Sequence, residues 1–242
     1  MALATEIRKQ ISQFPVGKTF GYADLRISKS EYATAAKALE RLQKEHLIKR
    51  LSKGVFYKPE QTIFGELKPG YAELLRSYLF ENGKRVAYET GASLYNRLGL
   101  TSQMAFRIQI ASRSKRIYID RGSLNASAVK SYAEVTDENY QVLGLLDAFK
   151  DIKIIQDSST SQIVRRLSAI VKNLKEDQIA LLIKYALVYP PRARALVGAI
   201  LENIGIKERG MDDLKDSLNP LTKIKISVKE TDLPTKTNWY IV

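Results

Sequence analysis

The 242-residue chain contains no cysteine and only one histidine. Without thiols it can form neither a disulfide nor a thiolate metal site, and it has no cysteine nucleophile. One histidine is too few for a histidine-rich metal centre. No apolar run approaches the roughly 20 residues of a membrane-spanning helix, and no apolar signal segment follows Met1. We therefore expect a cytoplasmic protein that does not associate with a membrane.

The common signatures of catalysis are also missing. There is no Walker-type phosphate loop and no glycine-rich dinucleotide fingerprint. Residues 91–95, Gly-Ala-Ser-Leu-Tyr, do not have the flanking pattern of a nucleophile elbow. The acidic pairs at 176–177 and 212–213 are typical of helix ends or solvated faces. We predict no enzyme, no catalytic residue, no metal and no cofactor, although linear spacing does not reveal carboxylates that converge in a metal nuclease.

Positive charge, by contrast, is abundant and unevenly distributed. The chain has 39 Lys and Arg against 26 Asp and Glu, a formal net charge of +13. Residues 1–59 contain 12 of these cations and five of these anions, so about half of the excess lies in the first quarter of the chain. A local excess of this kind is the electrostatic signature of nucleic-acid binding.

The segment 28–59 organises this basic region. Ser28 and Glu31 have the spacing of a capping box, and Ser30 is a second possible cap. The helix that follows has an apolar face at helical spacing, made by Tyr32, Ala35, Ala36, Leu39 and Leu42. Residues 47–51 and 55–58 read as strands, and Ser52-Lys53-Gly54 between them fits a hairpin turn.

A polar, cationic stripe runs along the opposite side of this helix and continues into the hairpin. Short hydroxyl side chains come first and long donors follow, which would allow close approach to a DNA backbone. The predicted DNA-binding residues are Lys29, Ser30, Thr34, Lys37, Arg41, Lys44, Lys49, Arg50 and Lys53; Lys58 is a further cation of the hairpin. Such a stripe alone is more often plain solvated surface. The elements before it and the local charge favour the DNA-binding interpretation.

Those elements complete the order of a winged helix-turn-helix. Leu3, Ile7, Ile11 and Phe14 predict a helix that Pro15 ends. Residues 16–20 read as a turn or short strand, and residues 22–27 as a short helix. Helix, strand, helix, helix, strand and strand then fit within 1–60, a DNA-binding domain that places one helix in the major groove.

The rest of the chain predicts an α+β fold. We expect a linker and connecting helix at 61–85, with a polar stretch at 60–70, and a C-terminal domain at 86–242. In that domain, residues 91–98 read as a helix ended by Gly99, and strands at 106–111, 116–120 and 124–129 as a small antiparallel sheet. Four helices follow from residue 137 to 204 as a helical bundle, and residues 224–228 alternate like a strand. The apolar end at 238–242 should dock on this domain.

Isolated residues outside these elements carry weaker signals. His46, at the end of the long helix, is typical of a half-buried structural histidine rather than a ligand or base. Arg165, Arg166, Arg192 and Arg194 could form a second surface that faces phosphate or a partner. Solvated helix faces are the commoner role for such arginines.

Three stretches resemble a known family. Residues 47–59, Leu-Ile-Lys-Arg-Leu-Ser-Lys-Gly-Val-Phe-Tyr-Lys-Pro, resemble the wing of the AbiEi-type antitoxins of bacterial type IV toxin–antitoxin systems. Residues 91–103, Gly-Ala-Ser-Leu-Tyr-Asn-Arg-Leu-Gly-Leu-Thr-Ser-Gln, resemble a motif of their second domain. The segments Leu218-Asn-Pro-Leu and Asn238-Trp resemble the closing pattern of a related uncharacterised bacterial branch. This chain has a longer helical C-terminal part than the shortest AbiEi proteins.

The resemblance implies a function in two parts. The N-terminal domain would bind double-stranded DNA at its own promoter and repress its operon, and the C-terminal domain would oppose a nucleotidyltransferase-type toxin, without requiring a stable direct complex. Two other classes stay open: a stand-alone winged-helix regulator or protein-interaction module without an antitoxin role, and an enzyme that acts on nucleic acid.

Overall fold

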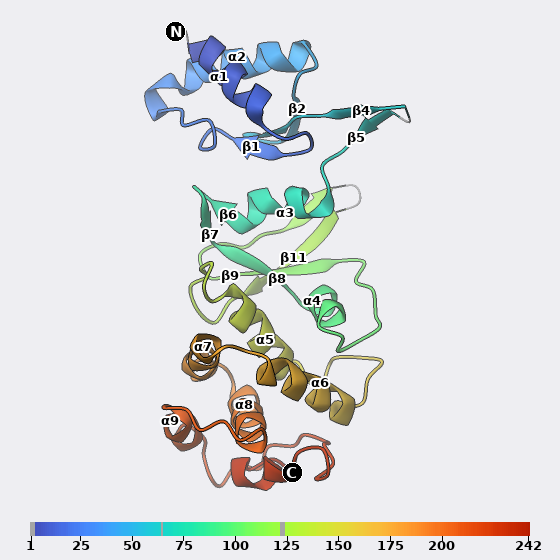
Figure 1. Ribbon diagram of the computed structural model, residues 1–242, viewed down its shortest axis with the longest axis vertical. Coiled ribbons are helices and arrows are strands. Elements are labelled where there is room, and N and C mark those ends of the chain that lie inside the picture. Colours follow the sequence, from blue (N-terminus) through green and yellow to red (C-terminus); the bar gives the residue numbers. More distant parts are fainter. Residues whose placement is uncertain (1–2, 64, 122–123) are drawn as a thin grey trace. The chain divides into compact units, whose positions relative to one another are not determined.

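A computed structural model describes residues 3–63, 65–121 and 124–242 and shows two compact units of an α+β protein (Figure 1). Unit 1 spans Met1–Arg85 and unit 2 spans Val86–Val242. Residues 1–2, 64 and 122–123 belong to the segments predicted as N-terminal domain, linker and C-terminal domain, and they lie outside the described residues.

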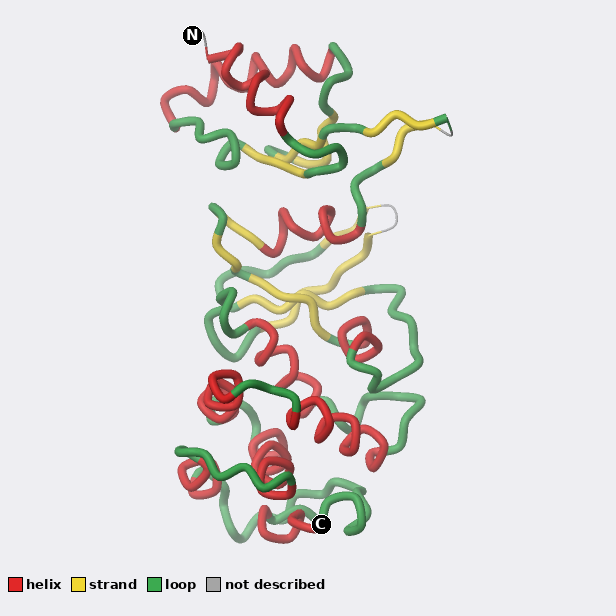
Figure 2. Tube along the Cα trace, in the orientation of Figure 1, coloured by secondary structure: helices red, strands yellow, loops and turns green. Residues whose placement is uncertain are grey.

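Unit 1 begins with two helices and a small antiparallel sheet, traced in Figure 2. The strand order is β1-β3-β2, and Thr19 of β1 pairs with Tyr57 of β3. The elements are α1 (Leu3–Gln13), β1 (Thr19–Gly21), η1 (Lys29–Glu31), α2 (Tyr32–Lys44), β2 (Lys49–Ser52) and β3 (Val55–Tyr57). The predicted hairpin at 47–58 is therefore confirmed, as is the first helix.

One apolar core joins these helices to the sheet. Its buried side chains are Ile7, Ile11, Phe20, Leu25, Ile27, Ala35, Ala38, Leu39, Leu42, Ile48 and Phe56. The expected face of α2 is shifted at two positions: Ala36 is exposed and Tyr32 is 43% exposed, while Ala38 is buried. Burial of this face fixes which side of α2 stays in solvent.

The short helix predicted at 22–27 is a series of turns. Arg26 donates its backbone N–H to the Ala23 carbonyl (3.2 Å), and its φ of 51° is left-handed. The left-handed backbone at Arg26 stops a helix from propagating through this segment. Burial of Leu25 and Ile27 holds the segment in place.

The segment predicted as a linker is folded. It contains two hairpins, β4 (Glu60–Thr62) with β5 (Gly65–Leu67) and β6 (Phe80–Glu81) with β7 (Lys84–Arg85), on either side of α3 (Tyr71–Leu79). Glu73 of α3 accepts hydrogen bonds from both the backbone N–H and the hydroxyl of Thr19 (each 2.9 Å). This contact ties α3 to β1. The polar residues at 60–70 that suggested a linker instead form the short hairpin of β4 and β5.

Unit 2 contains a mixed four-stranded sheet rather than the antiparallel sheet expected. Its elements are β8 (Ala87–Thr90), α4 (Ala92–Arg97), β9 (Ile108–Ser112), β10 (Ile119–Arg121) and β11 (Leu124–Lys130), in the order β10-β11-β9-β8. The expectation that the strands near 106–111 and 116–120 belong to a purely antiparallel sheet is wrong, because β9 pairs in parallel with β11, and β10 pairs with β11 rather than with β9 among the described residues. Strand β8 was not predicted. Phe106 precedes β9 and is fully exposed, at 100%.

Helices fill the rest of unit 2 and cover the sheet through α5 (Figure 1). They are α5 (Tyr140–Lys150), α6 (Thr160–Lys172), α7 (Glu176–Ala186), α8 (Pro191–Asn203), α9 (Met211–Asp216) and η2 (Pro234–Trp239). The four predicted helices are confirmed, and α9 is additional. The alternating residues 224–228 form only one bridge, between Ile224 and Ile241.

A buried carboxylate joins the sheet to the helices. Asp147 of α5 is 2% exposed. One of its oxygens accepts hydrogen bonds from the hydroxyls of Tyr88 (2.9 Å) and Thr90 (2.8 Å), and the other from the hydroxyl of Tyr189 (3.2 Å) and the ammonium of Lys150 (3.4 Å). Burial raises the pKa of Asp147, and Lys150 opposes that rise.

The C-terminal segment docks as predicted. Trp239 is 2% exposed, and its indole N–H donates to Glu202 (2.5 Å). The ring lies directly on Gly198 of α8, where a Cβ atom would clash with three ring carbons. The glycine is needed for this close approach and not for a special backbone angle.

Asp147→Ala should lower the free energy of unfolding of unit 2 by about 3–5 kcal/mol. The substitution removes the buried acceptor of the Tyr88, Thr90 and Tyr189 hydroxyls and of the Lys150 ammonium. Trp239 is the only tryptophan, so its fluorescence in a urea titration reports unit 2. Asp216→Ala, at an exposed helix end, is the control and should change stability by less than about 0.5 kcal/mol. Equal stability of the two variants would show that the carboxylate has no such structural role.

Gly198→Ala should release Trp239 from α8 and lower the stability of unit 2 by about 1–3 kcal/mol, the usual cost of overpacking. The emission maximum of Trp239 should shift to longer wavelength. Gly70→Ala is the matched control, since nothing lies within 4 Å of the added methyl group and no positive φ opposes it. An unshifted spectrum in Gly198→Ala would contradict the packing of the C-terminal segment.

Candidate nucleic-acid interface

The start of α2 is fixed by the predicted capping box. The Glu31 carboxylate accepts hydrogen bonds from the backbone N–H (3.2 Å) and the hydroxyl (2.5 Å) of Ser28. The Ser28 hydroxyl also lies 2.9 Å from that of Ser30. These hydrogen bonds lower the pKa of Glu31, with the Ser28 side chain as the largest cause. The chain therefore enters η1 and α2 in a defined direction.

The predicted polar stripe lies on the exposed side of η1 and α2. All of its members are exposed: Lys29, Ser30, Thr34, Lys37, Arg41 and Lys44. From Ser30 to Lys44, successive members are three or four residues apart, so they share one face of the helix, and Lys29 directly precedes Ser30 in η1. The opposite face, with Leu39 and Leu42, is buried in the core of unit 1. The structure thus brings these residues together on one accessible surface.

The β2–β3 turn carries Lys53 at its exposed tip. Gly54 has a φ of 75°, which a side chain rarely tolerates, and its carbonyl would lie 3.1 Å from a Cβ at Gly21. Glycine at both positions therefore lets the turn lie close to β1. Lys53 has no side-chain hydrogen bond or ion pair with the described residues.

Ion pairs and hydrogen bonds already engage three of the predicted cations. Lys44 pairs with Glu40 (3.0 Å), and Lys49 pairs with Glu66 of β5. Arg50 donates from Nε to the Ser52 carbonyl (3.2 Å). Lys29, Lys37 and Arg41 have no such partner in the described part of the chain. With Lys53, these are the four predicted cations that have no side-chain partner among the described residues.

Glu66 also organises the second hairpin. The Tyr57 hydroxyl donates to Glu66 (2.9 Å). Burial, together with this hydrogen bond and the glutamate charge, raises the pKa of Tyr57 to about 12. Glu66 therefore holds β5 beside β2 and β3 while it offsets the charge of Lys49.

Two other residues differ from expectation. Lys58 is a structural cation, since its ammonium donates to the carbonyls of Ser12 (3.0 Å) and Phe14 (3.2 Å) at the end of α1. His46 is exposed, not half-buried, and has a φ of 58°. It follows α2 in a left-handed conformation, and Leu47 donates its backbone N–H to the Leu42 carbonyl (3.0 Å), which closes the helix.

The predicted DNA-binding set does not include the residues just before η1. Arg26 is exposed, and its left-handed backbone places it in the turn that leads into the stripe. Tyr22 and Tyr32 pack with ring centroids 4.9 Å apart beside this turn. Helical periodicity located Tyr32, the first residue of α2, but it had no signal for Tyr22 and Arg26, which lie in the turns before the helix.

In residues 3–63, 65–121 and 124–242, no group of three or more His, Asp or Glu side chains could hold a metal ion. Within the same ranges, no helix combines the length and apolar character needed to cross a bilayer.

The fold and the exposed cationic face define a two-unit α+β protein with a basic surface on unit 1. Residues 6–179 match a family described as "Family of unknown function (DUF6088)", and the chain belongs to this family. No curated protein matches. Among solved structures, the crystal structure of RV2827C protein from Mycobacterium tuberculosis is similar, with a TM-score of 0.51 and 16% identity over 93% of this chain and 85% of that one. At this identity, the likeness concerns the fold alone.

The pKa of Glu31 should lie below its ordinary 4.5, because ionised Glu31 accepts both hydrogen bonds from Ser28. Its stabilising effect on the start of α2 is then present above 4.5 and is lost as the pH falls through the lowered pKa. Carbon-detected NMR titration of the carboxylate measures it. Ser28→Ala should return the pKa towards 4.5, and an unchanged value would contradict the cap.

Proposed function

We propose that residues 1–60 are a winged helix-turn-helix that binds double-stranded DNA. In this proposal α2 is the recognition helix, and the β2–β3 hairpin is the wing that lies along the adjacent backbone. The observation that carries it is the exposed face of α2 with Lys37 and Arg41, preceded by exposed Lys29 in η1, together with Lys53 at the tip of the β2–β3 hairpin.

The rigid support of this surface favours recognition over a mobile basic tail. The apolar side of α2 packs against α1 and the sheet, and the capping box fixes its start. Ser30 and Thr34 provide short hydroxyls for phosphate contacts, and Lys37 and Arg41 reach further, to base edges or phosphates. Lys44, Lys49 and Arg50 would take part once their present partners are exchanged for phosphate.

We further propose that this DNA is the protein's own promoter and that the protein is an autorepressor and antitoxin. The resemblance of residues 47–59 and 91–103 to AbiEi-type proteins supports this role, and a nucleotidyltransferase-type toxin would be the target. The proposal assigns binding rather than catalysis to the chain. A downstream reading frame that encodes such a toxin would support it, and co-expression with that toxin would test protection directly.

A protein-interaction module is the second candidate. It is favoured by exposed apolar side chains next to the stripe, Tyr32 at 43% and Leu47 at 42% exposed. The salt dependence of the binding affinity distinguishes the two candidates. Neutralisation of phosphates gives a steep loss of affinity as the salt concentration rises, whereas an apolar interface does not.

Lys37→Ala/Arg41→Ala should weaken binding to upstream duplex DNA by about 1–3 kcal/mol and lower the salt slope by about 2, since two phosphate or base contacts are lost. Titration by fluorescence anisotropy at low and moderate salt, against a shuffled duplex, measures both. Lys9→Ala/Lys84→Ala removes the same charge from exposed positions of unit 1 and is the control.

The control should bind within about twofold of wild type, because diffuse charge has a small effect after screening. If both double variants lose affinity equally, only net charge matters and α2 is not the recognition helix. If wild type fails to bind the upstream duplex at low salt, the DNA-binding proposal is wrong.

A further inference from the structure

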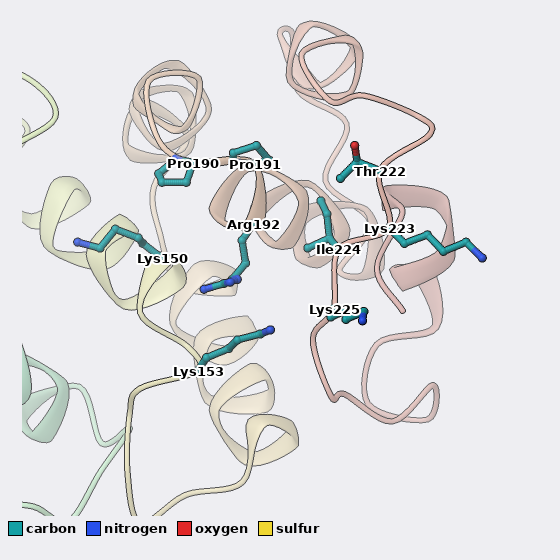
Figure 3. A pocket seen from close by; sticks show the side chains of 9 residues that line it. All are labelled: Lys150, Lys153, Pro190, Pro191, Arg192, Thr222, Lys223, Ile224 and Lys225. Carbon is teal, nitrogen blue, oxygen red and sulfur yellow. The ribbon is translucent and has the colours of Figure 1, made fainter.

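Unit 2 has a hollow of about 420 Å³ with an unusual lining, shown in Figure 3. The lining residues are Lys150, Lys153, Pro190, Pro191, Arg192, Thr222, Lys223, Ile224 and Lys225, and we call this site the cationic hollow. Five of these nine residues are cations and none is an anion. The site is unrelated to α2, which belongs to unit 1.

The five cations are not equivalent. The Lys150 ammonium points away from the hollow, towards Asp147 (3.4 Å) and Asp151 (3.6 Å). Lys223 also extends away, whereas Arg192 and Lys153 extend towards each other, and Lys225 lies on the facing segment (Figure 3). Lys153, Arg192 and Lys225 have no side-chain hydrogen bond or ion pair among the described residues.

Three separate parts of the chain hold these groups around the hollow. Lys153 lies in the turn after α5, between the buried residues Ile152 and Ile155. Arg192 is in the first turn of α8, after two prolines that restrict the backbone. The segment with Lys225 is tied to the C-terminus, since Ile224 donates to the Tyr240 carbonyl (2.8 Å) and accepts from Val242 (3.0 Å).

This arrangement of cations favours the binding of an anion in the hollow. Like charges held near one another repel, and a multivalent anion replaces that repulsion with charge-assisted hydrogen bonds. The positive end of α8, where Arg192 lies, adds to the same field. An arginine and flexible lysines are also the side chains that proteins use for phosphate oxygens.

The shape of the hollow favours a small molecule over a duplex. A concave site of a few hundred Å³ with apolar walls is typical of small-ligand binding. Pro190, Pro191 and the aliphatic side of Ile224 form such a wall beside the cations. DNA backbone contacts instead use extended, accessible surfaces such as the one on unit 1.

We propose that the cationic hollow binds a small molecule with two or three linked phosphates, such as a nucleoside triphosphate or free triphosphate. Arg192, Lys153 and Lys225 bind the phosphates. In a nucleotide, the sugar or base packs on the proline wall. Lys150 stays paired with its carboxylates and holds that side of the hollow in position.

Calorimetric titration of the full chain with inorganic triphosphate, ATP and adenosine tests the proposal. Both phosphate compounds should bind and adenosine should not. If ATP binds more tightly than inorganic triphosphate, the ligand is a nucleotide whose sugar or base contacts the proline wall. If the two bind equally, the phosphate chain alone is recognised. Absence of triphosphate and ATP binding at low salt overturns the proposal, as does equal binding of adenosine.

Lys153→Ala/Arg192→Ala should weaken triphosphate binding about tenfold or more, the loss expected when charge-assisted hydrogen bonds are removed. Lys172→Ala/Lys184→Ala removes the same charge from exposed helix positions of unit 2 and should leave affinity unchanged. Equal loss in both variants overturns the site. Lys225→Glu, at an exposed position, is a second test and should weaken binding without unfolding the protein.

Two further binding measurements distinguish phosphate binding by unit 2 from DNA binding by unit 1. Lys37→Ala/Arg41→Ala should leave triphosphate affinity unchanged, and Lys153→Ala/Arg192→Ala should leave duplex affinity unchanged. If the hollow variant instead weakens duplex binding and triphosphate does not bind, the hollow is a nucleic-acid contact and the proposal is wrong.

Discussion

The architecture of unit 2 depends on one buried carboxylate. An ionised Asp147 without partners would cost several kcal/mol, so its donors must be in place whenever the unit is folded. Those donors come from β8, from the residue before the prolines of α8, and from the last turn of α5. The network therefore fixes the sheet against two helices. It also sets where Lys150 and Pro190 stand, and with them one side of the cationic hollow.

In unit 1 the corresponding constraint is apolar. Burial of Leu39 and Leu42 decides which face of α2 reaches solvent, and the capping box decides where the helix begins. The functional surface is then smaller than the charge of the segment suggests, because Glu40 and Glu66 compensate Lys44 and Lys49. Binding of phosphate would compete with these pairs. The Lys44–Glu40 pair is exposed and therefore weak, so competition with this pair costs little.

The family match establishes membership of DUF6088, and the likeness to the mycobacterial structure concerns the fold alone. Neither names a function, so the proposals are argued from the surfaces of the two units. The two units present cations in different ways. Unit 1 offers an extended helix face and a hairpin tip, which suit a polymer. Unit 2 offers a concave site lined by prolines, which suits a compact anion. Each proposal therefore rests on its own residues and fails or stands separately.

Local sequence patterns were enough to predict the long helices, the capping box, the β2–β3 hairpin and the stripe on α2, because each depends on neighbours within a few residues. It also indicated the docking of Trp239. Tertiary structure decided the rest. Parallel pairing of β9 with β11 joins strands distant in the chain, and alternation in each strand is the same for either partner. The segments at 22–27 and 60–70 were misjudged because burial of Leu25 and Ile27 holds the first and the contacts of Glu66 with Tyr57 and Lys49 hold the second, rather than local periodicity. The sequence also did not show which cations lack a partner. Ion pairs such as Lys49 with Glu66 join residues distant in the chain, and such pairs follow no sequence period.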